Sequence, residues 1–140
     1  MKINILFSVV ICLLTFSCAV APQEIQYEKD QCHACRMMIS DPRFGAELVT
    51  IKGKVYKFDA IECMLPEVIK NGKEAYAFIL ATDFQQPGKL LDVKDLDFLI
   101  NDQVPSPMGR NLSAYQLPDH KSIADSNWFD WSGLLMHFNQ

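Results

Sequence analysis

The sequence predicts an α+β protein made of two small ββα-like halves that share one core. A hairpin followed by a helix occurs twice along the chain, at roughly 46–70 and 97–126. Residues 1–17 read as a cleaved signal peptide and lie outside the fold. The sequence then divides into a tether at 18–28 and one domain at 29–140, whose halves run roughly over 29–73 and 74–140.

The first half begins with a hairpin. Ala46–Ile51 and Val55–Phe58 are rich in β-formers, and the Lys52-Gly53 dipeptide between them predicts the turn. The hairpin leads directly into the next element, for which Asp59 is a candidate N-cap and Glu62 its capping-box partner.

A helix follows this cap. Its buried face is predicted from apolar residues at helical spacing, namely Ile61, Leu65, Val68 and Ile69. Pro66 should kink or shorten the helix, and Asn71-Gly72 should end it. At about 100° per residue, Cys63 lies about 180° from the centre of the apolar stripe and Met64 about 80° from it. Cys63 is therefore expected to point towards solvent or towards the segment that precedes the hairpin.

The second half is predicted to contain a strand, a loop, a second hairpin and two C-terminal segments. The strand is Ala75–Ala81, and the loop is Asp83–Leu90 with Pro87-Gly88. The strands Asp97–Ile100 and Asn111–Leu117 flank Ser106-Pro107-Met108-Gly109, Pro118–Ser126 is a short polar helix, and Trp128–Phe138 is an aromatic-rich segment.

The N-terminus indicates export and lipidation. Lys2 precedes an apolar run, Ile5–Leu14, that is too short to span a bilayer and is typical of a secretory signal. Ser17 and Leu14 suit a loose bacterial lipobox, so we expect Cys18 to carry the lipid, in preference to simple secretion. Residues 19–28 would then hold the domain off a membrane of the bacterial cell envelope.

The charge of the chain excludes nucleic acid as a partner. The formal net charge is −4, and it becomes −5 after cleavage because 12 Lys and Arg then face the same 17 Asp and Glu. Phosphate binding requires clustered cations, and the sequence has no run of Lys or Arg.

The cysteine count leaves an odd number of thiols. Cys12 leaves with the signal and Cys18 is the lipidation site, so Cys32, Cys35 and Cys63 remain. A disulfide framework needs an even number, so at least one thiol stays free, and metal ligation is one reason to keep it. The alternative is a Cys32–Cys35 disulfide with Cys63 as an idle buried thiol.

The segment Cys32-His33-Ala34-Cys35-Arg36-Met37-Met38 points to a soft metal. Thiolate together with thioether favours Cu(I), whereas a zinc site more often recruits imidazole or further cysteine. A zinc knuckle would need Cys63 as a third ligand and His33 or His120 as a fourth. A thioredoxin-like redox pair would sit at a helix N-terminus, whereas this pair precedes a hairpin.

Two further methionines and the remaining histidines have different expectations. Met108 lies on a turn, where it is either a ligand or a side chain packed under a loop. We expect Met136 to belong to the core. His120 and His137 have no partners at ligand spacing and are expected to be surface or packing residues.

Three segments together resemble the NosL family: CHACRMMISDPRFGAEL, KVYKFDAIECML and SPMGRNLSAYQ, in this order between about Asp30 and Trp131. The family comprises lipid-anchored periplasmic copper-binding proteins associated with assembly of nitrous oxide reductase. The resemblance implies a Cu(I) carrier with two ββα-type halves that delivers copper to that enzyme. Its copper-associated residues would fall on Cys32, Cys35, Met37 and Met108. The family usually has glycine where this chain has Arg36, so either the knuckle or the choice between Met37 and Met38 differs here.

The sequence therefore predicts a periplasm-facing Cu(I)-binding lipoprotein that acts as a copper chaperone and is not an enzyme, with the outer membrane as one destination. Its predicted metal residues are Cys32, Cys35, Met37, Met108 and Cys63. The alternatives are a thiol–disulfide oxidoreductase that uses Cys32 and Cys35, and a structural zinc-knuckle protein.

Overall fold

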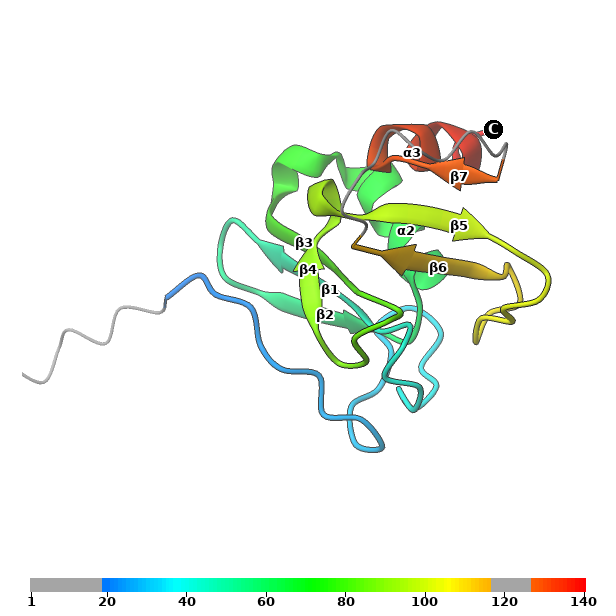
Figure 1. The fold of residues 1–140 in the computed structure, drawn as a ribbon. Helices are drawn as coiled ribbons and strands as arrows, with labels where there is room; N and C mark the ends of the chain where they lie inside the picture. The colour runs from blue at the N-terminus through cyan, green and yellow to red at the C-terminus, as the bar shows by residue number, and fades with distance from the viewer. Residues whose placement is uncertain (1–18, 117–126) are drawn as a thin grey trace, which may run out of the picture.

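The computed structural model describes residues 19–116 and 127–140, and it confirms the predicted mixture of helix and sheet (Figure 1). The described strands form two small antiparallel sheets, ordered β2-β1-β3-β4 and β6-β5-β7. The strands are β1 (Ala46–Thr50), β2 (Val55–Phe58), β3 (Tyr76–Thr82), β4 (Leu90–Asp92), β5 (Asp97–Ile100), β6 (Leu112–Tyr115) and β7 (Trp128–Phe129). The α-helices are α2 (Ile61–Asn71) and α3 (Trp131–Phe138), and Lys73–Ala75 and Val93–Asp95 form 3₁₀ helices.

The first hairpin forms as the sequence predicts. Ala46 of β1 lies opposite Phe58 of β2, and Val49 lies opposite Val55. Gly53 closes the turn at a φ of 82°, a left-handed conformation that glycine adopts without a steric penalty. β3 pairs with the other side of β1, so β1 is a central strand, and its first four residues are buried.

Helix α2 begins and ends where predicted, but its N-terminus is not capped as predicted. The N-cap is Ala60, and it makes no side-chain hydrogen bond. The Asp59 cap and the Glu62 capping box were therefore wrong. Both carboxyl groups are buried against other parts of the protein, and Glu62 bonds Ser106. For Glu62, a partner 44 positions along the chain has replaced the local one.

The C-terminal half of α2 passes through Pro66 without being shortened. The helix continues to Asn71, and Gly72, at a φ of 78°, donates its N–H to the carbonyl of Val68 at 2.9 Å. Proline removes one helical hydrogen bond. Packing of the helix compensates, because most helical stability in proteins comes from tertiary contacts.

The core lies around α2, between the two sheets. The helix contacts β1 and β2 of the first sheet, β6 of the second sheet, and α3. Ile61, Leu65 and Val68 are buried, as their spacing predicts, and Met64 is fully buried beside them. One continuous cluster of apolar side chains thus joins both sheets.

The second hairpin pairs β5 with β6, with Asp97 opposite Tyr115, and β7 adds to the other edge of β5. The predicted helix Pro118–Ser126 lies outside the described residues.

β4 is a strand that the sequence did not indicate. Residue 73 is the predicted boundary between the two halves, and β3 and β4 follow it. Both nevertheless pair into the first sheet, which therefore contains strands from both predicted halves.

The aromatic C-terminal segment divides into β7 and α3. Asp130 caps α3 by accepting a hydrogen bond from the Gly133 N–H at 2.6 Å. The helix buries Trp131 and Leu134. The prediction that Met136 is a core residue was wrong, because its side chain is 68% exposed. Two residues beyond Leu134, it lies on the opposite face of the helix.

The N-terminal segment lies along the first sheet. The backbone N–H of Gln23 donates to Glu47 Oε1 at 2.9 Å, and Lys57 Nζ donates to the carbonyl of Glu24 at 2.7 Å. Ile25 is 3% exposed. Part of the segment expected to act as a tether is therefore packed on the domain. Within the described ranges, neither helix has the length and hydropathy needed to cross a membrane.

Candidate metal centre

A tight loop carries the two N-terminal cysteines. Gln31 and Met38 pair as an antiparallel bridge and close the base of the loop. Inside it, the Cys32 N–H donates to the carbonyl of Met37 at 2.8 Å, and the Arg36 N–H donates to the carbonyl of Cys32 at 3.0 Å. We call residues 32–37 the knuckle.

Arg36 adopts the backbone conformation that glycine would adopt most easily. Its φ is 65°, in the left-handed region. For a residue with a Cβ atom this region costs roughly 1–2 kcal/mol. The turn thus forms with arginine at a position that favours glycine, and its hydrogen bonds offset the backbone strain.

His33 fastens the knuckle to β2. Its N–H donates to the carbonyl of Lys57 at 2.8 Å, and its ring lies 4.3 Å from the ring of Tyr56 and 6.0 Å from that of Phe58. The imidazole ring packs against these two aromatic rings. Neither of its nitrogen atoms belongs to the group of possible metal ligands described next.

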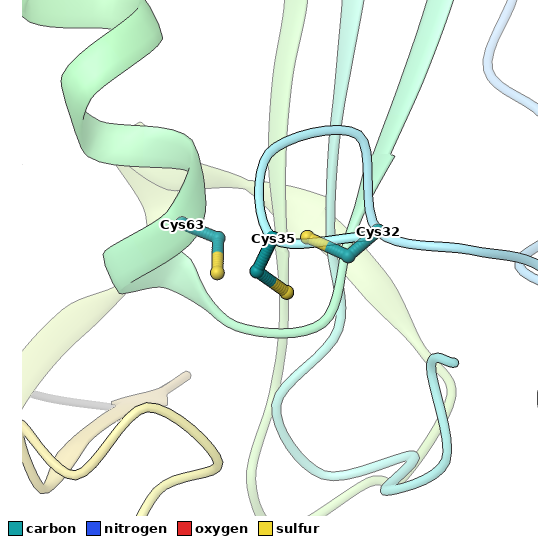
Figure 2. Close-up of side chains that lie close together, drawn as sticks. All are labelled: Cys32, Cys35 and Cys63. Atoms are coloured by element: carbon teal, nitrogen blue, oxygen red, sulfur yellow. The ribbon is translucent and has the colours of Figure 1, made fainter. Parts of the chain in front are cut away.

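Cys32, Cys35 and Cys63 come together. Figure 2 shows Cys63 projecting from the first turn of α2 towards the knuckle that carries the other two. Their three Sγ atoms lie within 4.8 Å of one another, and all three are free thiols. Cys32 is fully buried, Cys63 is 7% exposed and Cys35 is half-buried. Of the two directions expected for Cys63, towards solvent or towards the segment before the hairpin, the structure has the second.

The three sulfur atoms share their protons unequally. The hydrogen bond from the Cys63 thiol, together with the N–H groups of Asp59 and Cys35, lowers the pKa of Cys32 to about 4, against the opposing effect of burial. The same hydrogen bond raises the pKa of Cys63. Burial raises the pKa of Cys35. These pKa shifts favour the thiolate form of Cys32 and the thiol forms of Cys35 and Cys63.

Met108 reaches the same place from the second hairpin. Ser106-Pro107-Met108-Gly109 forms a turn in which the Gly109 N–H donates to the carbonyl of Ser106 at 3.0 Å, with proline at its second position. Met108 lines a surface pocket together with Cys35 and Cys63. We call this the thiol pocket; its lining residues are Ala34, Cys35, Glu62, Cys63, Pro66, Glu67, Met108 and Arg110.

The other methionines lie elsewhere. Met37 and Met38 are 52% and 51% exposed, and neither lines the thiol pocket. Met64 is buried in the core and does not reach the pocket surface. Met108 is thus the methionine that the described residues bring to the pocket with two of the cysteines.

Two acidic residues near the cluster were missed as parts of the site. Asp59 is 2% exposed, and burial raises the pKa of its carboxyl group, with the Cys32 charge acting in the same direction. Burial also raises the pKa of Glu62, opposed by its hydrogen bond with Ser106. The signal that could have found them is their nearness to Cys63 in the sequence, since Asp59 is four residues and Glu62 one residue before it. The capping-box pattern offered a local explanation for both residues instead.

Comparisons with known proteins agree with this architecture. The NosL family model matches residues 22–135. Among solved structures, the fold is similar to the crystal structure of the copper chaperone NosL from Shewanella denitrificans, with a TM-score of 0.60 and 16% identity over 71% of this chain and 81% of that one. No curated protein matches the chain. Since the family match spans most of the sequence and the fold agrees with it, the chain belongs to the NosL family.

Proposed function

We propose that this protein is a Cu(I)-binding copper chaperone and not an enzyme. The observation that carries the proposal is the gathering of three thiols, two of which line a surface pocket together with Met108. Thiolate and thioether are the soft ligands that favour Cu(I). The structural relative from Shewanella denitrificans is a copper chaperone, which supports the same assignment.

The ligands we propose are Cys32, Cys35, Cys63 and Met108. Cys35 and Cys63 border the pocket, so an incoming ion meets sulfur at the surface before it reaches the buried Cys32. Met37, which the family resemblance also suggests, remains a proposed ligand on the exposed side of the knuckle. A sulfur site that borders a surface pocket in this way holds Cu(I) and can still release it.

The geometry gives less support to the two alternatives. Structural zinc sites are closed by four cysteine or histidine ligands. The described residues gather only three, all of them cysteines, and the imidazole of His33 packs at a tilt against the ring of Tyr56. Thiol–disulfide exchange requires an accessible thiolate. Here the thiol with the lowered pKa is Cys32, which has no exposed surface.

The proposal includes a client and a location. By the family resemblance, the client is nitrous oxide reductase, and the protein faces the periplasm from a lipid on Cys18. Several acyl chains give stable anchoring, since each buried CH₂ contributes about 0.8 kcal/mol. In cells given a labelled fatty acid, the label should appear on the wild-type protein and be absent from Cys18→Ser. Equal labelling of the two would refute the anchor.

Metal titration tests the binding function. Reduced protein should take up about one Cu(I) in competition with bicinchoninate, and Zn²⁺ should displace it poorly because thioether is a weak ligand for zinc. The copper-loaded protein should then restore the copper absorption of metal-free nitrous oxide reductase. If the protein does not bind Cu(I) but catalyses disulfide exchange at a rate near that of thioredoxin, the thiol–disulfide oxidoreductase alternative is correct instead.

A further inference from the structure

Glu62 is a buried acid beside the thiol cluster. It lies on α2 next to Cys63 and is 8% exposed. Its Oε1 accepts a hydrogen bond from the Ser106 hydroxyl, and its Oε2 has no hydrogen-bond partner among the described residues. Burying a carboxyl group is costly unless it is well paired. The groups that counter this cost are the Ser106 hydroxyl and the backbone N–H groups of Glu62 itself, Arg110 and Leu112. Apart from its own N–H, they all come from the loop between β5 and β6 and the start of β6, far along the chain, so the contact joins α2 to that loop.

Ser106 lies in the loop between β5 and β6 and makes hydrogen bonds both within this loop and to α2. It is 7% exposed, and its hydroxyl oxygen also accepts the Asn111 N–H at 2.9 Å. Its carbonyl accepts the Gly109 N–H, and the ends of the loop are tied where the Asn101 N–H donates to the carbonyl of Asn111 at 3.0 Å. The loop is thus closed on itself, and the bond to Glu62 joins it to α2.

This bond connects the two sides of the thiol pocket. Cys63 is the residue after Glu62, and Met108 is the second residue after Ser106; both line the pocket. Holding Ser106 on Glu62 therefore fixes the separation between the thioether of the second hairpin and the thiol of α2. We propose that Glu62 is a positioning residue that acts through Ser106 to hold Met108 in place for Cu(I). The inference rests on the proposed function.

Direct ligation by Glu62 does not fit the same geometry. The group of metal-type ligands within 4.8 Å of one another contains the three cysteines and no carboxyl oxygen. Residues that orient metal ligands without touching the metal have large effects, and their mutation typically costs about 10–100-fold in affinity. Glu62 is expected to belong to this class.

The test is a mutant cycle read out as Cu(I) affinity against bicinchoninate. Glu62→Ala should weaken binding about tenfold. Ser106→Ala, a milder change in the loop, should weaken it in the same direction. Glu62→Gln should retain nearly wild-type affinity, because the amide carbonyl still accepts the Ser106 hydroxyl. In a Met108→Ala background, Glu62→Ala should change affinity by less than about threefold, since its effect passes through Met108.

X-ray absorption of the Cu(I) form gives a second readout that general destabilisation would not move. The number of sulfur atoms around copper should fall by one in both Glu62→Ala and Met108→Ala. Glu47→Ala is the matched control, because Glu47 is also a buried carboxyl with an unpartnered oxygen among the described residues. It lies on β1 of the first sheet and accepts a hydrogen bond from the backbone N–H of Gln23 in the N-terminal segment. This variant should lower stability and leave the copper signature unchanged.

The outcomes separate the inference from the function. Wild-type protein without Cu(I) binding would refute the proposed function, and the inference with it. Normal binding in wild type together with wild-type affinity in both Glu62→Ala and Ser106→Ala would overturn the inference alone. So would wild-type affinity in Met108→Ala, an undiminished Glu62→Ala loss in that background, or a Glu62→Gln loss as large as that of Glu62→Ala.

Discussion

Cys32→Ser should abolish most Cu(I) binding, with a loss of affinity greater than about 100-fold, the upper end of what supporting residues contribute. Cys32 is the sulfur on which the cluster converges, because it accepts hydrogen bonds from the Cys63 thiol and from the N–H groups of Asp59 and Cys35. Serine keeps the size but replaces a soft thiolate with a hard, neutral hydroxyl. Competition with bicinchoninate measures the change.

The controls for this variant separate ligation from folding. Thermal unfolding of the metal-free variant should show that it remains folded, and Met136→Ala, which changes an exposed methionine on α3, should bind Cu(I) like the wild type. Cys32→Ala provides a second substitution without a buried hydroxyl. Wild-type affinity in both Cys32 variants would remove this residue from the site.

Phe58→Ala should destabilise the metal-free protein by about 3–5 kcal/mol, the usual cost of deleting a buried aromatic side chain. Phe58 has no exposed surface, lies opposite Ala46 at the end of β2, and contacts the ring of His33 edge to face. Its loss leaves a cavity beneath the knuckle. Urea unfolding followed by circular dichroism measures the change.

Met136→Ala is the comparison for this stability measurement as well. Its side chain is 68% exposed, so the change should stay within about 0.5 kcal/mol. A cost below about 1 kcal/mol for Phe58→Ala would show that the knuckle and β2 are not held by the contacts described above.

Local patterns predicted the elements whose signals lie within a few residues. The Lys52-Gly53 turn, the apolar face of α2 and the stop at Gly72 all depend on neighbouring residues. β4 is three residues long and forms through pairing with β3, so no periodic pattern could announce it. Met136 was wrongly assigned to the core of an amphipathic C-terminal segment, because the buried face of α3 is the one with Trp131 and Leu134 and Met136 lies on the other face.

The sequence predicted the three thiols that come together and the methionine that lines the pocket, but not the side chains that support them, and the role of Met37 stays a prediction. Cys63 was recognised because it lies away from the apolar stripe of its helix, and Met108 because it lies on a turn. Tertiary packing brings both residues to one pocket. Glu62 could not be recognised, because its partner Ser106 lies 44 residues away and the capping-box pattern supplied a nearer explanation. Side chains that act across a fold leave no periodic trace in the sequence.

The hydrogen bond from the Gln23 N–H to Glu47 fixes residue 23 to the domain, so only the residues before it can act as a free tether to a membrane. With the proposed lipid on Cys18, five residue steps separate the anchor from this point, a reach of at most about 18 Å for extended chain. The domain would then explore a thin layer above the lipid surface. A copper-receiving enzyme would be met by lateral diffusion within that layer, and a freely dissolved client would have to come to the membrane first.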